Sequence, residues 1–375
     1  MIEVLPLNGL RVVELSHAVM GPACGLVLAD LGAEVIRIEP PGGDPTRQLK
    51  GFGIGYFSFF NRNKKSVCID LKSKIGCENL SRLLETTDIL IENFAPGTLD
   101  KLGFSYDAVR QINQEIIYCS LKGFLSGPYE NRHALDEVVQ MMGGLAYMTG
   151  PHGNPLRAGT SVVDIMGGTF GSTAILAALY ERTFTGTGKY IRSGLFESTA
   201  FLMGQHMACS VLSGKPVPPM PHRVSAWSVY RVFKSAQDKP IFIGLVSDKH
   251  WIRFCEEFQF ADLLCNAKYK TNADRINERD ILLPDLETRF QKLGFEEICN
   301  RCEKANIPFA PVARPEDLFT DPHLSQKWLL PTIFPDGTPT LMPSLPIEWN
   351  GEVLPCRLPP PQVGEHTNEI LDSLK

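Results

Sequence analysis

The fold is set by Leu10-Arg-Val-Val-Glu-Leu-Ser-His-Ala-Val-Met-Gly-Pro22 and the stretch that follows it, Ala23-Cys-Gly-Leu-Val-Leu-Ala-Asp-Leu-Gly-Ala-Glu-Val-Ile-Arg-Ile-Glu39. Leu10–Leu15 and Glu34–Glu39 are β-branched runs typical of buried strands, and Ala23–Leu31 is apolar and helix-forming. Gly21-Pro22 and Gly32-Ala33 indicate the turns between them. A strand, a helix and a second strand in this order predict a βαβ unit and therefore a parallel sheet.

This βαβ unit ends in the acid Glu39, which is the layout of a nucleotide-binding half-fold. The dinucleotide fingerprint G-x-G-x-x-G is absent, because Met20-Gly-Pro-Ala-Cys-Gly25 holds only two glycines. A conventional NAD site is therefore disfavoured. An α/β unit without any ligand remains an alternative on this pattern alone, since a fold does not imply a function.

The remaining chain predicts two domains. Short β-branched runs alternate with helical stretches up to about residue 200, which predicts a large doubly wound, Rossmann-like α/β domain. The proline-rich Gly214–Pro221 is typical of a linker. Beyond it, Val229–Phe233 and Ile241–Leu245 predict a hairpin, and Leu286–Lys304 predicts a helix, in a small α/β domain. We place the large domain, the linker, the small domain and a C-terminal segment at residues 1–200, 201–224, 225–320 and 321–375, respectively.

Composition and charge narrow the class of protein. The 375 residues carry a net charge of −5, which offers no bulk attraction to nucleic acid or to an anionic membrane. The start, Met1-Ile-Glu-Val-Leu5, lacks the basic and apolar segments of a secretory signal. The most apolar stretch, Ile165–Tyr180, looks too short and too rich in glycine to span a bilayer. We therefore expect a cytoplasmic enzyme whose partners include neither nucleic acid nor membrane.

The cysteines point to a reducing compartment. Ten of them are scattered over the chain without the dense spacing of a disulfide framework. Cys299 and Cys302 form a single C-x-x-C pair, and no second pair of Cys or His completes a zinc site. We therefore expect no bound metal.

One acid stands out in the stretch Arg157-Ala-Gly-Thr-Ser-Val-Val-Asp-Ile-Met-Gly-Gly-Thr169. Asp164 follows a β-branched run and opens the apolar helix predicted over Ile165–Tyr180. It would lie at the helix N-terminus among backbone N–H donors, where a carboxylate stays ionised and partly shielded from water. Those are the properties of a carboxylate nucleophile. An ordinary N-cap is the alternative, because Asp also fills that position well.

At this point the chain resembles the class III CoA-transferases, the family of formyl-CoA:oxalate, carnitine and succinyl-CoA:dicarboxylate CoA-transferases. The resemblance covers nearly the whole chain in six ordered blocks. The strongest blocks are Asn61-Arg-Asn-Lys-Lys-Ser-Val-Cys-Ile-Asp-Leu-Lys72, Glu92-Asn-Phe-Ala-Pro-Gly97 and Ile307-Pro-Phe-Ala-Pro-Val312. Arg157–Gly171, which contains Asp164, is another of the six.

The resemblance implies an architecture. In this family the C-terminal segment returns to the large domain, and each chain is an open ring that interlocks with a second ring as a homodimer. It also implies that coenzyme A and acyl-CoA are substrates, with no permanently bound cofactor.

The resemblance also implies a reaction. Asp164 matches the nucleophile of the family, which attacks an acyl-CoA to give a mixed anhydride and then an aspartyl-CoA thioester. The second substrate is a small carboxylic acid. Succinyl-CoA as donor and a short dicarboxylate such as itaconate, mesaconate or glutarate as acceptor are the substrates we expect.

Contacts to CoA follow from the matching motifs. They lie in the segments after the predicted strands, where the family touches the pantetheine, adenine and phosphates. A solvated side chain is the alternative for each lysine, and a turn with a core aromatic is the alternative for the Asn-Phe pair. The residues are His17, Ala18, Val19, Ile69, Lys72, Asn93, Phe94 and Lys101.

A second acid, Asp136, matches a family carboxylate near the active site, where it would position the acceptor or shape the local field. Its alternative is an N-cap of the helix predicted over Glu137–Met142. Racemases of the same superfamily carry a His directly before the equivalent Asp as their proton-transfer partner. This chain has Leu135 there, which weakens the hypothesis that the protein is a racemase.

Several cations are candidates for a second carboxylate on the substrate. They are Arg47, His133, Arg157, His222 and Arg223.

Three functions from different classes stay open. They are a CoA-transferase, which the full Asp164 motif favours, an acyl-CoA racemase or isomerase, and a non-catalytic CoA-binding protein.

Overall fold

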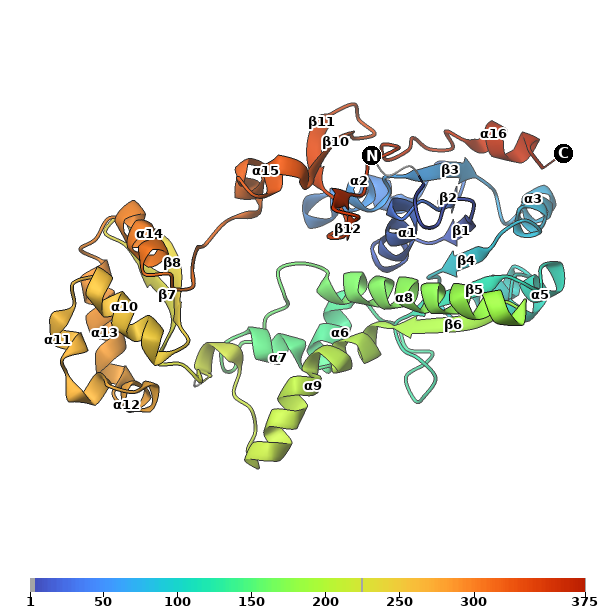
Figure 1. Cartoon of the computed structure of the whole chain (residues 1–375). Coiled ribbons are helices and arrows are strands. Elements are labelled where there is room, and N and C mark those ends of the chain that lie inside the picture. Colours follow the sequence, from blue (N-terminus) through green and yellow to red (C-terminus); the bar gives the residue numbers. More distant parts are fainter. Residues whose placement is uncertain (1–3, 224, 375) are drawn as a thin grey trace. The chain divides into compact units, whose positions relative to one another are not determined.

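The computed structural model of the protein describes residues 4–223 and 225–374 (Figure 1). The chain divides into two compact units, Met1–His222 with Pro322–Lys375 and Arg223–Asp321. Each unit has its own hydrophobic core. The linker that we expected over residues 201–224 is helical as far as Ser213, and Gly214 then ends the helix with a φ of 65° that suits glycine.

The larger unit is built on a parallel sheet of six strands in the order β3-β2-β1-β4-β5-β6 (Figure 1). This confirms the parallel α/β sheet predicted from the βαβ pattern. The chain moves outward from β1 to β3 and then returns to the other side of β1 for β4, so the strand order reverses between β1 and β4. The strands are β1 (Arg11–Leu15), β2 (Glu34–Glu39), β3 (Lys64–Cys68), β4 (Ile89–Glu92), β5 (Ile117–Lys122) and β6 (Lys189–Gly194).

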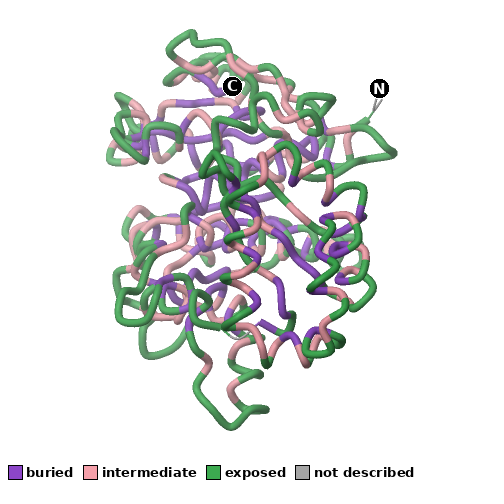
Figure 2. The backbone as a smooth tube through the Cα atoms, turned by 90° about the vertical axis from the view of Figure 1, so that its left-hand side faces the viewer, coloured by how far each residue is buried: buried purple, intermediate pink, exposed green. Residues whose placement is uncertain are grey.

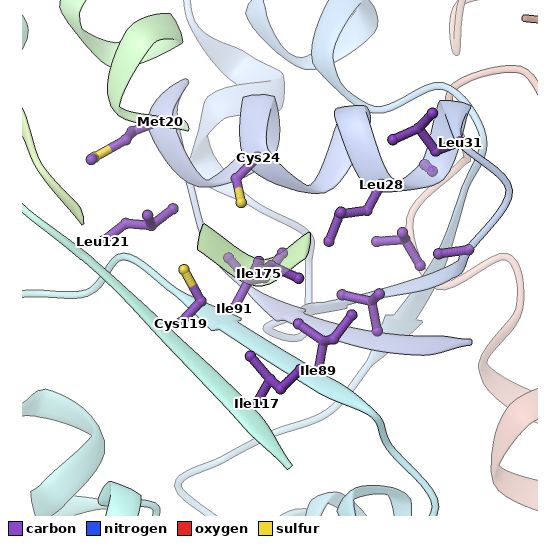
Figure 3. Close-up of a cluster of buried hydrophobic side chains, with 14 of the residues drawn as sticks. Met20, Cys24, Leu28, Leu31, Ile89, Ile91, Ile117, Cys119, Leu121 and Ile175 are labelled. Carbon is purple, nitrogen blue, oxygen red and sulfur yellow. The ribbon is translucent and has the colours of Figure 1, made fainter. Parts of the chain in front are cut away.

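Helices cover both faces of this sheet, because alternate strand residues point to opposite sides. Val12 and Ile89 face one core, and Val13 and Leu90 face the other. The first core is shown in Figure 3, where side chains of α1 (Met20–Asp30) and α8 (Val162–Thr185) pack on those of β4 and β5. The second core lies under α3 (Lys74–Leu84), α5 (Tyr106–Ile112) and α16 (Thr367–Asp372).

The helices α1 and α8 pack in close contact through glycine. A Cβ atom on Gly168 would lie 2.6 Å from the Met20 carbonyl oxygen and 2.9 Å from the Cys24 nitrogen. A Cβ atom on Gly171 would lie 2.7 Å from the Leu121 side chain. Gly168 therefore allows the backbones of α1 and α8 to approach, and Gly171 makes room for a side chain of β5 (Ile117–Lys122).

By length and composition α8 could cross a membrane, so the expectation that its apolar stretch is too short was wrong. The prediction failed because the helix extends beyond Ile165–Tyr180 at both ends, to Val162 and Thr185. Its close packing on α1 and on the strands of the sheet is that of a core helix.

The first helix begins earlier than its sequence predicts. We expected a turn as far as Pro22, whereas α1 begins at Met20 with Pro22 in its first turn. Proline is tolerated there because the N–H groups of the first turn have no intrahelical partner. The other helices before the smaller unit are α2 (Tyr56–Phe60), α4 (Thr98–Lys101), α6 (Asp136–Met142), α7 (Leu145–Thr149) and α9 (Leu195–Ser213).

The C-terminal segment packs along β3, the edge strand of the sheet (Figure 1). Asn63 has a φ of 60°, and its Oδ1 accepts from the backbone N–H groups of Arg357 and Leu358 at 2.6 and 2.9 Å. Further along, the His366 N–H donates to the Ser66 carbonyl at 2.9 Å. The edge is thereby covered. This part of the chain holds α15 (Leu324–Lys327), β10 (Leu329–Ile333), β11 (Pro339–Pro343), β12 (Glu348–Trp349), β13 (Glu352–Val353) and α16.

The smaller unit is an antiparallel three-stranded sheet in the order β7-β8-β9 with helices packed on it. The predicted hairpin is confirmed as β7 and β8. The single helix expected over Leu286–Lys304 was wrong, because Gly294 separates two helices there. The elements are β7 (Val229–Lys234), β8 (Pro240–Leu245), β9 (Phe309–Pro311), α10 (Asp248–Glu257), α11 (Ala261–Leu264), α12 (Asn272–Asn277), α13 (Arg279–Phe290) and α14 (Phe295–Lys304).

Candidate active site

The segments that follow β1 and β4 meet at the carboxyl edge of the sheet. The His17 N–H donates to Asn93 Oδ1 at 3.0 Å, and Asn93 Nδ2 donates to the His17 carbonyl at 2.9 Å. The rings of His17 and Phe94 stack with centroids 5.9 Å apart. This is the point where the strand order reverses, and open α/β sheets bind ligands in the crevice at such a point. Three of the predicted CoA contacts therefore lie together at a position suited to a ligand.

The other predicted CoA contacts differ in their exposure. The side chains of Val19 and Ile69 are buried, so those two residues can offer a ligand only backbone groups. Lys72 follows β3, Lys101 ends α4, and both are exposed. No ion pair to either ammonium group occurs among the described residues, which leaves both free for phosphate.

A buried ion network lies beneath the loop after β1. Glu14 of β1 is fully buried and accepts from Arg37 Nη1 at 2.6 Å and from Lys64 Nζ at 2.8 Å. Burial lowers the pKa of Lys64 to about 8, although Glu14 opposes that shift. A Cβ atom on Gly25 would lie 1.8 Å from Glu14 Oε2, so only glycine fits beside this carboxylate. Gly25 therefore makes room for a buried acid.

The same network holds the loop itself. Arg37 Nη2 donates to the Ser16 carbonyl at 3.0 Å and pairs with the Asp44 carboxylate. Asp44 Oδ1 accepts from the Thr46 N–H at 2.8 Å, and Thr46 Oγ1 accepts from the Ala18 N–H at 3.0 Å. Ala18 has a φ of 58°, which is unusual for a residue with a side chain. These contacts stabilise a strained backbone conformation at the candidate CoA loop.

Asp164 is the third residue of α8, and its side chain does not cap that helix. The N-cap position is Ser161, which makes no side-chain cap bond. The N-cap alternative for Asp164 is therefore wrong. Burial, and next the nearby charge of Asp136, raise the pKa of Asp164 to about 7, while Arg157 opposes the shift. Both effects favour the protonated form, so this acid is harder to ionise than an ordinary aspartate.

The N-terminal N–H groups of α8 are already in use. The Val162 N–H donates to the Thr160 carbonyl at 2.8 Å, and the Ile165 N–H donates to the Ser161 carbonyl at 3.0 Å. The N–H groups of the two residues between them donate to Asp136. This helix end therefore has no free donor in its first turn for the Asp164 carboxylate.

Asp136 is the residue that receives those two hydrogen bonds. Its Oδ2 accepts from the Val163 and Asp164 N–H groups at 3.0 and 3.2 Å, and its Oδ1 accepts from Gln140 Nε2 at 2.5 Å and from Arg157 Nη2 at 3.3 Å. The N-cap alternative for Asp136 is also wrong, because Leu135 holds that position of α6. Asp136 instead caps α8 across space.

Two polar residues beside the acids were missed by the sequence analysis. Gln140 is fully buried, and its Oε1 accepts from the Ala158 N–H at 2.9 Å. Its spacing of four residues from Asp136 on a helix is a signal that could have found it. Tyr56, whose hydroxyl lies 3.2 Å from Ser161 Oγ, stands in an apolar aromatic run that gives no such signal.

Arg157 is the one candidate for a substrate carboxylate that pairs with Asp136. Its Nη1 also pairs with the exposed Glu137 at 3.0 Å. Its guanidinium lies over the Phe52 ring, 5.0 Å from the centroid, and Phe52 is 62% exposed. The acids therefore have an arginine and an aromatic side chain beside them.

The remaining candidates lie elsewhere. Arg47 makes two hydrogen bonds to Glu39, at 2.6 and 2.7 Å, and a third to a backbone carbonyl, so its guanidinium is already occupied. His133 is exposed, and His222 contacts His152 at a ring distance of 5.8 Å. Arg223 belongs to the smaller unit, where it lies over the Tyr230 ring. Among the described residues, no hydrogen bond or ion pair joins Arg47, His133 or His222 to Asp136.

A cavity of about 350 Å³ opens at the opposite, amino edge of the sheet. Arg11 and Lys65 line it, and both pair with Glu34. The two cations of this cavity are thus already paired with Glu34. The cavity lies at the edge of the sheet opposite to the segments that follow β1 and β4. Among residues 4–223 and 225–374, no group of three or more His, Cys, Asp or Glu is placed to hold a metal ion.

The chain is similar to known proteins over nearly its whole length. Residues 7–367 match CoA-transferase family III. The chain is similar to the succinate–glutarate CoA-transferase of Agrobacterium fabrum, with 32% identity over 99% of this chain and 96% of the relative. It is also similar to the acetyl-CoA:oxalate CoA-transferase of Acetobacter aceti, with 34% identity over 92% of this chain and 90% of the relative. A crystal structure of a CAIB/BAIF family protein from Brucella suis matches with a TM-score of 0.88 and 31% identity, covering 100% of both chains.

The chain therefore belongs to CoA-transferase family III, and it is an enzyme of acyl-CoA metabolism. The resemblance recognised from the sequence motifs is confirmed.

Proposed function

We propose that this enzyme transfers CoA from an acyl-CoA donor to a small dicarboxylic acid, with Asp164 as the covalent nucleophile. One observation carries the proposal: the Asp164 carboxylate has no hydrogen-bond or ion-pair partner among the described residues, although the Asp136 carboxylate beside it accepts four hydrogen bonds. A half-buried acid kept free in this way is available to react.

The reaction proceeds in balanced steps. The Asp164 carboxylate attacks the thioester carbonyl carbon, and the C–S bond breaks to give a mixed anhydride and the CoA thiolate. The thiolate then attacks the Asp164 carbonyl carbon, releases the donor acid and forms an aspartyl-CoA thioester. The acceptor carboxylate then attacks the aspartyl-CoA carbonyl carbon and displaces the CoA thiolate, which gives a second mixed anhydride. The thiolate attacks the acceptor carbonyl carbon of this anhydride, which forms the new acyl-CoA and releases the Asp164 carboxylate. The acyl energy stays in covalent bonds, and neither water nor an oxidant takes part.

Asp136 acts in this proposal through charge and position. Its four acceptor bonds occupy both carboxylate oxygens, so it has no free lone pair with which to attack. It holds the first turn of α8 and keeps the Asp164 side chain close to a like charge. A nucleophile with a raised pKa is more basic and hence more nucleophilic once it is deprotonated.

The loop after β1 is the proposed pantetheine contact. The stacked His17 and Phe94, with Asn93 between the two loops, support this position at the strand reversal. Lys72 and Lys101 would meet the CoA phosphates as point charges.

Arg157 and Phe52 support a short dicarboxylate as the second substrate. A substrate carboxylate can displace the exposed Glu137 from Arg157, because a surface ion pair is worth little. The relatives named for succinate, glutarate and mesaconate agree with such substrates, and we expect succinyl-CoA as the donor.

A panel experiment tests this function. The pure enzyme is incubated with succinyl-CoA and, separately, glutarate, mesaconate, itaconate, oxalate and acetate, and new acyl-CoA species are identified by mass. We expect transfer to a dicarboxylate in the wild type and none in Asp164→Ala. Turnover by Asp164→Ala would overturn the mechanism, and transfer only to acetate would overturn the substrate class.

We further propose that the enzyme is a cytoplasmic homodimer. Exposed apolar side chains on α8 and α9 support an interface, among them Tyr180, Phe184, Phe201, Val211 and Leu212. The C-terminal part of α9 is mostly exposed. It is the lowest part of the chain in Figure 1, and the lowest part of the tube in Figure 2 is largely green. All ten cysteines are free, which supports a reducing compartment. Light scattering should give twice the chain mass of 41.6 kDa, and a monomer would contradict the proposal.

A further inference from the structure

We propose that Gln140 is a positioning residue for the transfer reaction: its buried amide orients Asp136 against the N-terminus of α8 and fixes the loop that carries Arg157. The inference rests on the proposed role of Asp164 and adds a residue that acts on it through Asp136.

The hydrogen bonds assign the orientation of the amide. Gln140 Oε1 must be the acceptor from the Ala158 N–H at 2.9 Å, because a backbone nitrogen only donates. Its Nε2 then points to Asp136 Oδ1 at 2.5 Å and donates to it. Gln140 therefore joins two elements, α6 and the loop before α8, with one donor and one acceptor.

This placement has consequences because Gln140 is fully buried. No solvent can replace either partner, so loss of the amide leaves the Ala158 N–H unsatisfied and leaves Asp136 Oδ1 with Arg157 Nη2 as its one remaining donor among the described residues. Asp136 would then be held only by Arg157 and by the N–H groups of Val163 and Asp164. Its angle to the nucleophile would no longer be defined.

A change at position 140 can reach Asp164 only through the groups that lie near its carboxylate. Asp136 on α6 and Arg157 on the preceding loop act on it directly, and Glu137 acts through its pair with Arg157. Within the described part of the chain, the hydroxyl of Tyr56 on α2 hydrogen-bonds with Ser161. The residues of α1 that pack against α8 carry no charge, since the single acid of that helix, Asp30, pairs with Arg62.

Gln140→Met tests the loss of both hydrogen bonds in a side chain of similar size. We expect kcat to fall about tenfold to a hundredfold, as for loss of a hydrogen bond to a charged group. The KM for acyl-CoA should stay within about twofold, because Gln140 does not touch CoA in this proposal. Gln111→Met, on the exposed surface of α5, is the matched control and should behave as wild type.

Gln140→Glu separates positioning from simple structural support. The glutamate still accepts from the Ala158 N–H, so folding is retained, but it donates to Asp136 only when protonated. Two carboxyl groups this close share a proton. We expect kcat of Gln140→Glu to decline at high pH, through a limb that wild type and Gln111→Glu lack.

The outcomes are distinct. Wild-type kcat in Gln140→Met, or a Gln140→Glu enzyme whose activity falls equally at all pH values, would reject the positioning role. Neither result touches the function proposed for Asp164, which fails only if Asp164→Ala turns over. Melting temperatures of all variants are measured alongside, and an unfolded Gln140→Met leaves the pH profile of Gln140→Glu to decide.

Discussion

The side chain of Asp136 is hydrogen-bonded to the backbone of Asp164: Asp136 Oδ2 accepts from the Asp164 N–H at 3.2 Å. The same oxygen accepts from the Val163 N–H at 3.0 Å, so a residue of α6 satisfies the second and third N–H groups of α8. An N-cap side chain normally satisfies these groups from within its own helix. The contact also brings two carboxylates together, and this proximity contributes to the raised pKa of Asp164.

Asp136→Ala should destabilise the protein by about 1–2 kcal/mol, the cost of losing a strong N-cap. Urea unfolding with an unchanged m-value measures this loss. Glu137→Ala is the control on the same helix, and as an exposed position it should change stability by about 0.5 kcal/mol or less. Equal stability of the two variants would argue against capping across space.

Asp164→Asn should stabilise the protein at and above neutral pH while it abolishes transfer. The folded pKa of Asp164 is about 7 against an ordinary value of 3.8. Between those values the folded state holds a proton that the unfolded state has lost, so stability falls as pH rises from about 4 to about 7. One pKa unit is about 1.4 kcal/mol, and with a discount for partial exposure we expect a gain on the order of 1–2 kcal/mol. Thermal unfolding at pH 5 and pH 8 tests this, and a destabilised Asp164→Asn at pH 8 would contradict it.

The pH–rate profile should show an acidic limb near pH 7. Asp164 reacts only when deprotonated, and its pKa is about 7, so kcat/KM should fall tenfold per unit below that value. Asp136→Asn removes the neighbouring negative charge and should move the limb to lower pH. A limb near pH 4 in the wild type would show that the reacting acid titrates normally.

Lys72→Ala and Lys101→Ala should each raise the KM for acyl-CoA with a smaller effect on kcat. Contacts to the CoA phosphates stabilise the bound ground state and the transition state about equally. Loss of a charged hydrogen bond corresponds to about tenfold to a hundredfold in KM. Steady-state kinetics with succinyl-CoA measure this, and an unchanged KM in both variants would remove these lysines from the site.

Arg37→Met should destabilise the protein by about 3–5 kcal/mol, because it leaves Asp44 as a buried charge without its cation and leaves Glu14 paired with Lys64 alone. Arg11→Met, which breaks the half-exposed pair to Glu34, should cost about 1 kcal/mol or less. Chemical denaturation of the two variants makes the comparison. Similar losses would mean that the network beneath the CoA loop contributes no more than a surface ion pair.

The candidate site shows where sequence patterns reach their limit. The sequence predicted His17, Asn93 and Phe94 as separate CoA contacts, and the structure brings them together because β1 and β4 are neighbours in the sheet. Arg47 is instead paired with Glu39, although it reads in the sequence like any other surface arginine. A motif identifies a residue type at a spacing, but burial and pairing depend on what packs against it.

The sequence by itself determined the βαβ pattern, the parallel sheet, the family and the singular position of Asp164. These follow from periodicities of 2.0 and 3.6 residues and from ordered motifs, which depend on neighbours along the chain. Only the tertiary structure decided that Asp136 caps α8, that Gln140 also binds the Ala158 N–H, and that the pKa of Asp164 is raised. The two capping bonds join Asp136 to residues 27 and 28 positions away, and the bond to Ala158 joins Gln140 to a residue 18 positions away. Hydrogen bonding and desolvation at such separations are set by packing.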